Sequence, residues 1–216
     1  SEFFILTLLS LLGCMIMVSS SSVLSIYLGV ELFALPIYAL IALERDCAYA
    51  SEAAMKYFIM GAVASALLLY GISLLYGLSG SLVFKDIAVF VQSGMNQSPL
   101  LLFALVFIVA ALCFKLGAVP FHMWLPDVYE GGALSVVSYL GSVPKLAALG
   151  FLVRILIDTL PGLSDHWQIL LLCFGMLSII VGNVCALVQQ NILRLLAYST
   201  ISHVGFILLG FILLVL

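Results

Sequence analysis

Long runs of apolar residues fill most of this sequence and leave few positions for polar side chains. Hydrophobic residues make up 65% of the chain and charged residues 8%, and that charged share is about a third of what a soluble domain carries. A run of about 20 apolar residues matches the thickness of a bilayer core. Lipid cannot satisfy backbone hydrogen bonds, so such runs form helices or closed barrels. The runs lack two-residue alternation and therefore predict an all-α, polytopic bundle of transmembrane helices.

About seven spans fit the apolar runs, each long enough to cross a bilayer. We expect them at about 3–18, 23–43, 51–76, 99–119, 134–157, 167–188 and from 192 onward. Together they form a single transmembrane domain over residues 1–216. The chain begins without Met and stops inside an apolar run, so we expect a piece of a longer protein, cut at both ends.

Two kinds of segment interrupt this pattern. The stretch 77–98 is rich in Gly, Ser and polar residues, which predicts a loop with a short interfacial helix at 82–91. Prolines at 120 and 126 prevent the segment 120–127 from forming one regular helix. Pro144 is expected to interrupt the fifth span, so the bundle should contain discontinuous helices.

Three ionisable residues, Glu31, Lys115 and Lys145, fall well inside apolar spans. Each costs about 2.5–3.5 kcal/mol to insert, which argues that they have a use. Each also lies near a proline, where freed carbonyls and water can solvate a charge. The structural alternative is a buried ion pair between Glu31 and a lysine that only fixes packing. Exchanging such a pair for apolar residues is often neutral or stabilising, which weakens this alternative.

Lysine suits proton transfer inside a membrane. Burial makes a lysine easier to deprotonate, and an approaching carboxylate reverses that effect. A Glu–Lys contact that tightens and loosens can therefore load and release a proton near neutral pH. We predict Lys115 as the switching carrier, Glu31 as its modulating partner and Lys145 as the next station.

Three further residues are weaker candidates. Lys56 lies about one turn inside its span, so snorkelling to the surface and a role near Glu31 are equally supported. Histidine titrates near physiological pH, which makes His122 and His203 candidate relays. A lone histidine is nevertheless more often a structural hydrogen-bonding residue.

Several other classes of site are not supported by the sequence. The five cysteines contain no C-x-x-C pair, so neither a disulfide framework nor a metal site is expected. The net charge of −3 is small and its carriers are scattered, which excludes nucleic-acid binding as an interpretation. No glycine motif for phosphate binding is present. Trp124, Trp167 and Tyr129 match interfacial aromatic anchors.

The segment 114–131 carries a long and specific pattern, Lys followed by Pro-Phe-His-x-Trp-x-Pro-Asp. It resembles the antiporter-like membrane subunits of respiratory complex I, a family shared with Mrp-type cation/proton antiporters and membrane-bound hydrogenases. Residues 29–40 resemble the span that holds the family's key glutamate, 56–58 the lysine-bearing start of the next helix, and 193–205 a later helix. The amino-acid sequence at 127–131 and 143–145 is most similar to the subunit N branch of the NADH–quinone oxidoreductases.

This resemblance implies a proton channel in which Glu31 and Lys115 are the coupled pair. Lys145 would continue the hydrophilic axis and Lys56 would join the relay. After Gly131 the family commonly has Ala-Pro-Thr-Pro, whereas this chain has Gly-Ala-Leu-Ser at 132–135.

The resemblance also implies a proton-translocating subunit of an NADH–quinone oxidoreductase, a translocase without a redox centre of its own. NAD, FMN, iron–sulfur clusters and quinone would then lie in partner subunits, among them the other membrane subunits of complex I. A bacterial inner membrane is the expected location, with the lipid bilayer around the chain. The alternatives are a subunit of an Mrp-type secondary cation/proton antiporter and a passive membrane scaffold.

Overall fold

The computed structural model describes residues 2–43, 46–93 and 98–215, and most of these are helical. In chain order the α-helices are α1 Glu2–Ser19, α2 Val23–Ile41, α3 Ala48–Ser79, α4 Phe84–Gln92, α5 Pro99–Leu116, α6 Trp124–Gly131, α7 Leu134–Val153, α8 Ser164–Val188 and α9 Ile192–Val215. A π-helical turn, Arg154–Thr159, and a 3-10 turn, Pro161–Leu163, join α7 to α8.

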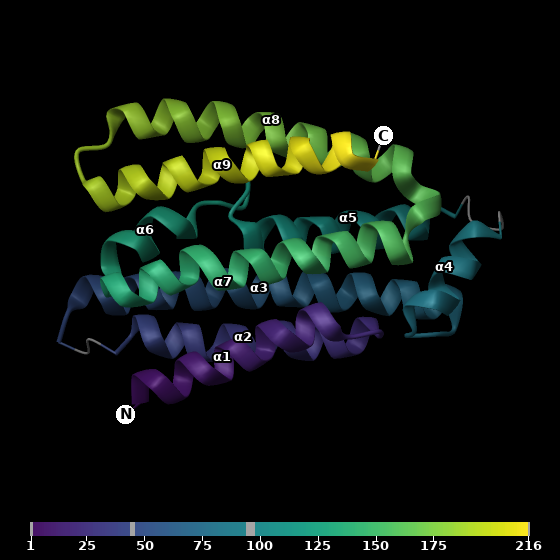
Figure 1. Ribbon diagram of the computed structural model, residues 1–216, viewed down its shortest axis with the longest axis horizontal. Coiled ribbons are helices and arrows are strands. Elements are labelled where there is room, and N and C mark those ends of the chain that lie inside the picture. Colours follow the sequence, from purple (N-terminus) through teal and green to yellow (C-terminus); the bar gives the residue numbers. More distant parts are fainter. Residues whose placement is uncertain (1, 44–45, 94–97, 216) are drawn as a thin grey trace.

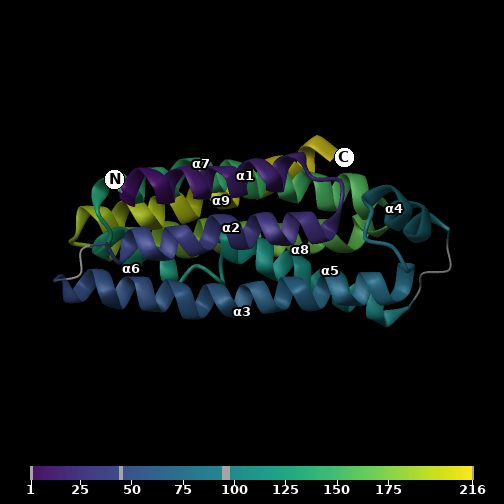
Figure 2. The same cartoon turned by 90° about the horizontal axis from the view of Figure 1, so that it is seen from below.

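Seven helices in the described part of the chain are long and apolar enough to cross a membrane. They are α1, α2, α3, α5, α7 with its π-helical extension, α8 with the preceding 3-10 turn, and α9. Their axes run side by side along the longest dimension of the molecule, and α4 lies at one end (Figures 1 and 2). The predicted all-α, multi-pass membrane bundle is confirmed, as is the short helix expected near 82–91.

The helices approach one another closely where glycine lies at the contact. A Cβ on Gly205 of α9 would lie 2.7 Å from the carbonyl oxygen of Gly175 in α8. A Cβ on Gly71 of α3 would lie 3.0 Å from the carbonyl oxygen of Ala104 in α5. Such small residues allow tight backbone contact, which drives helix association where water does not. The pairs α8–α9 and α3–α5 therefore form firm units of the bundle.

A break in the bundle lies between α5 and α6, where the sequence predicts it. Helix α5 ends at Leu116, and Gly117 adopts the left-handed conformation with φ of 77°. The chain then passes through 118–123 before α6 begins at Trp124. Glycine adopts the left-handed backbone conformation at little cost because it has no Cβ. Gly117 can therefore turn the chain out of the helix at this point.

The interruption expected at Pro144 is wrong, because α7 continues past this residue as a helix. Helix α2 likewise contains Pro36 in its interior. A proline removes one backbone donor, but packing inside a membrane bundle lets the helix continue. The irregular part of this span lies later, in the π-helical turn Arg154–Thr159.

The tryptophans are core residues in this chain, so their prediction as interfacial anchors is wrong. Trp124 and Trp167 are each 1% exposed. The Trp124 ring stacks on Tyr57 of α3, with 4.4 Å between ring centroids. Its indole N–H also donates to the carbonyl oxygen of Phe114, 3.1 Å away. Trp124, a buried indole with its donor satisfied, belongs to the packing of the core. The buried Nε1 of Trp167 has no hydrogen-bond partner among the described residues.

Candidate functional site

The three ionisable residues predicted inside the membrane lie on three different helices of the bundle. Glu31 is on α2, Lys115 on α5 and Lys145 on α7. The two lysines are buried, at 7% and 8% exposure. Among the described residues, neither lysine Nζ nor the buried Oε1 of Glu31 has a hydrogen-bond partner. Buried charges are normally paired, so unpaired ones mark this region as a candidate functional site.

Lys115 occupies the last turn of α5, directly before the break in the bundle. Its Nζ lies 5.0 Å from the ring centroid of Phe33 on α2 and 5.8 Å from that of Phe114. The C-terminal end of a helix carries a partial negative charge that favours a cation. Aromatic faces and the helix end therefore solvate this ammonium group in place of water.

Glu31 lies on α2, the helix whose Phe33 ring is 5.0 Å from the Lys115 Nζ. Within the described residues, however, no ion pair joins Glu31 to Lys115 at 4.0 Å or less. Glu31 and Lys115 therefore do not form a fixed ion pair in this structure.

The backbone at the break is hydrogen-bonded step by step. The amides of Gly117 and Ala118 donate back to the carbonyls of Phe114 and Cys113, at 3.0 and 2.8 Å, which is a Schellman arrangement. The next amide, that of Val119, donates to the hydroxyl of Ser178 on α8, at 2.9 Å. The end of the helix that carries Lys115 is thus held by defined contacts.

Lys145 borders a cavity of about 310 Å³ between α7 and α9. Thr200 and His203 of α9 line the same cavity. The Lys145 Nζ lies 5.8 Å from the ring centroid of Tyr129, in α6. The structure therefore brings Lys145 and His203 together at one cavity, as a relay between them requires.

His122 lies elsewhere, in the broken segment between α5 and α6. Its ring faces Tyr198 of α9, with 6.4 Å between the ring centroids. The residue is partly buried. His122 therefore lies at the break after Lys115, beside α9, and does not line the cavity that Lys145 and His203 share.

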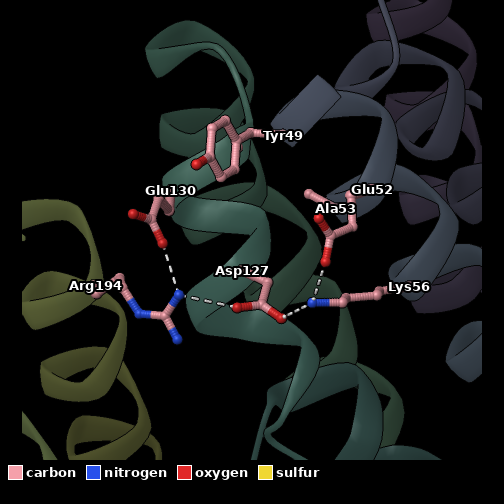
Figure 3. A pocket seen from close by; sticks show the side chains of 8 residues that line it. Tyr49, Glu52, Ala53, Lys56, Asp127, Glu130 and Arg194 are labelled. Atoms are coloured by element: carbon pink, nitrogen blue, oxygen red, sulfur yellow. Dashed lines mark hydrogen bonds and ion pairs between the residues drawn. The ribbon is translucent and has the colours of Figure 1, made fainter. Parts of the chain in front are cut away.

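A second group of charged residues lies at one end of the bundle and joins α3, α6 and α9 (Figure 3). Lys56 Nζ contacts Glu52 Oε1 at 2.8 Å and Asp127 Oδ2 at 2.9 Å. Arg194 Nη1 contacts Asp127 Oδ1 at 3.0 Å and Glu130 Oε2 at 2.6 Å. Asp127 therefore bridges cations from two other helices. We call these five residues the charged end cluster.

Lys56 belongs to this cluster, and its side chain is 46% exposed. Its ionic contacts are with Glu52 and Asp127, which fits the snorkelling interpretation better than a place beside Glu31. The hydrogen bond from Arg194 holds the pKa of Glu130 below its ordinary value. Sequence reasoning did not assemble this cluster; the spacing of Glu52 and Lys56, one helical turn apart, was the only local signal.

Among the described residues, no group of three or more His, Cys, Asp or Glu side chains could hold a metal ion. The titratable side chains described above are amines, carboxylates and imidazoles, which can take up and release protons.

Comparison with known proteins adds to this geometry. Residues 20–215 match the transmembrane family described as NADH:quinone oxidoreductase/Mrp antiporter. The subunit N of the NADH-quinone oxidoreductase of Herminiimonas arsenicoxydans is 54% identical over 209 residues, which are 97% of this chain and 42% of that protein. The same subunit of Thioalkalivibrio sulfidiphilus is 55% identical over 210 residues, or 97% and 44% of the two chains.

Two solved structures share the fold. A chain of the respiratory complex I from Thermus thermophilus with bound aureothin gives a TM-score of 0.82 at 38% identity, covering 96% of this chain and 44% of that chain. A chain of the Mrp complex from Dietzia sp. DQ12-45-1b gives 0.85 at 23% identity, covering 95% and 38%, and shows a common fold alone. This chain spans less than half the length of each relative. It belongs to the NADH:quinone oxidoreductase/Mrp antiporter transmembrane family.

Proposed function

We propose that this chain forms part of the proton-translocating subunit N of a bacterial NADH–quinone oxidoreductase. In this proposal Glu31, Lys115 and Lys145 carry the protons within the membrane. The observation that carries the proposal is the presence of two buried lysines, on α5 and α7, that have no hydrogen-bond partner in the described part of the chain. A purely structural lysine would be expected to have a carboxylate in contact, since an unpaired buried charge is costly.

The proposed mechanism depends on how the surroundings of Lys115 change. When the Glu31 carboxylate approaches, it stabilises the ammonium form and Lys115 takes up a proton. When the carboxylate withdraws, desolvation favours the neutral amine and the proton leaves. Lys145 receives the proton as the next station, and His203, which lines the same cavity, is its candidate acceptor. His122 is a candidate relay at the break. Lys56, near the exposed start of α3, is a further candidate member of the relay.

The proposed driving force is quinone reduction in partner subunits. We place NAD, FMN, the iron–sulfur clusters and quinone in those partners, with further complex I membrane subunits beside this chain in a bacterial inner membrane. Curated bacterial relatives with 54–55% identity, named as subunit N, support this assignment. The alternative is a subunit of an Mrp-type secondary cation/proton antiporter. The shared fold supports it, but the sequence identity to the Mrp chain is lower, at 23%.

The test is Lys115→Met in the intact parent complex, with Lys85→Met as the matched control. Lys85 is exposed on α4, so its replacement removes the same charge away from the bundle interior. Quinone reductase activity and proton uptake are measured together in inverted membrane vesicles, and assembly is checked by the recovery of the complex.

The proposal expects both activities to fall in Lys115→Met while Lys85→Met keeps them. If Lys115→Met oxidises NADH and takes up protons at wild-type rates, the residue is outside the obligatory path and the scaffold interpretation replaces the proposal. If the parent complex instead exchanges protons for cations without NADH and quinone, the antiporter alternative holds.

A further inference from the structure

The chain leaves helix α5 two residues after Lys115, and its next backbone amides need other acceptors. Those of Gly117 and Ala118 are satisfied within the turn itself. Val119 is 7% exposed, so its amide cannot rely on water, and lipid offers no acceptor. Pro120, which follows, has no N–H to donate. The amide of Val119 is therefore the last donor before Pro120, at the point where the chain has just left α5.

Ser178 of α8 supplies the acceptor for this amide. Its hydroxyl oxygen lies 2.9 Å from the nitrogen of Val119, and the residue is 0% exposed. The same hydroxyl donates to the carbonyl oxygen of Phe174, one turn earlier, at 2.6 Å. A serine hydroxyl has one proton and two lone pairs. Because its proton is already used on Phe174, the lone pairs remain for Val119.

Helix α8 is a firm support for this contact. Gly175 and Gly182, on either side of Ser178, pack directly against the backbone of α9. The ring of Phe174 also meets that of Phe121 edge to face, with 6.1 Å between centroids. Two contacts from one turn of α8 therefore reach the broken segment behind Lys115, and glycine packing fixes that turn against its neighbour.

We propose that Ser178 is a positioning residue for Lys115. Its hydroxyl anchors Val119 and thereby sets where α5 ends and how its last turn presents the Lys115 amine to Glu31. This inference rests on the proposed function of Lys115 as a proton carrier. Removing the hydroxyl leaves a buried amide without an acceptor, so the segment must shift to find another one.

The experiment compares Ser178→Ala with Ser20→Ala in the intact parent complex. Both hydroxyls donate at 2.6 Å to a carbonyl four residues earlier. The Ser178 hydroxyl also accepts a hydrogen bond from the distant Val119 amide. Ser178→Thr keeps the hydroxyl and serves as the conservative variant. Lys115→Met is measured in the same series. The readouts are proton uptake in inverted vesicles and deuterium exchange of the peptide that covers residues 117–123.

In Ser178→Ala we expect proton uptake to fall by about five-fold or more, the low end of what an unsatisfied buried donor is worth, and exchange of the 117–123 peptide to rise. Ser178→Thr and Ser20→Ala should stay within about two-fold of wild type, since both keep the Val119 acceptor. Wild-type proton uptake or unchanged exchange in Ser178→Ala overturns the inference.

A second substitution covers failed assembly. If Ser178→Ala does not assemble, Ser178→Cys retains the shape with a weaker acceptor, and an unchanged rate there also overturns the inference. The Lys115→Met measurement separates the two proposals. Inactive Lys115→Met beside fully active Ser178→Ala rejects the positioning role alone, whereas fully active Lys115→Met rejects the carrier role on which it rests.

Discussion

Replacing Gly205 by alanine should force α8 and α9 apart. The new Cβ would lie 2.7 Å from the carbonyl oxygen of Gly175, 2.8 Å from Cγ1 of Ile179 and 3.0 Å from the nitrogen of Ile179. Two of these three atoms belong to the backbone and cannot rotate away. The conflict can be relieved only if the two helices separate locally.

The size of the effect follows from two opposing terms. Forcing an extra methyl group into a close-packed contact costs about 1–3 kcal/mol. Alanine in a helix gains about 0.5–1 kcal/mol over glycine because glycine loses more backbone entropy on folding. The net destabilisation expected for Gly205→Ala is therefore about 1 kcal/mol, within a range of about 0–2.5 kcal/mol.

Gly210 provides the matched control in the same helix. A Cβ at this position has nothing within 4 Å, so only the favourable term applies. Gly210→Ala should be neutral or stabilising by up to about 1 kcal/mol.

The assay is the midpoint of thermal inactivation of the solubilised complex, measured for both variants beside wild type. Gly205→Ala should lower the midpoint, and Gly210→Ala should leave it unchanged or raise it. Equal midpoints for the two variants would refute the argument that glycine contact holds α8 against α9.

Three further predictions concern the segment between α5 and α9. Asp127→Asn should lower the thermal midpoint more than Glu52→Gln, because Asp127 bridges cations of two other helices whereas Glu52 pairs within α3; the difference should shrink in high salt. Trp124→Phe removes the indole donor to the Phe114 carbonyl of α5, which keeps its bond from Gly117, and should destabilise by about 0.5–1.5 kcal/mol, measured by thermal or denaturant unfolding. The pKa of Glu130 is lowered by its hydrogen bond to Arg194, so its stabilising contribution is present above the ordinary carboxyl pKa and is lost as pH falls through the lowered value. The thermal midpoint of wild type should therefore drop more on acidification below about pH 4.5 than that of Glu130→Gln.

The membrane spans could be predicted because hydropathy acts residue by residue. An apolar run of sufficient length must be helical in lipid whatever its neighbours are, so the seven spans follow directly from the printed sequence. The break after Lys115 was predictable for a similar reason. The backbone limits of Pro120 and the freedom of Gly117 are local properties that do not depend on the rest of the fold.

The features that sequence reasoning missed all depend on distant partners. Lys56 and Asp127 are 71 positions apart, and Asp127 and Arg194 are 67 apart, so no local spacing indicates that they meet. From the sequence, Trp124 is predicted to be interfacial, but in the fold its ring stacks on Tyr57 of α3. From the sequence, Pro144 is predicted to break its helix, but in the packed bundle α7 continues through this residue. In each case the tertiary environment overrides a local preference.

Helix α6 connects the buried lysine to the exposed end of the bundle. At its start, Trp124 donates to the carbonyl of Phe114, the residue next to Lys115. Further along, Asp127 and Glu130 are tied to α3 and α9 by ion pairs. The helix has only eight residues. It therefore carries, within about two turns, both the indole that contacts the Lys115 turn and the carboxylates of the charged end cluster.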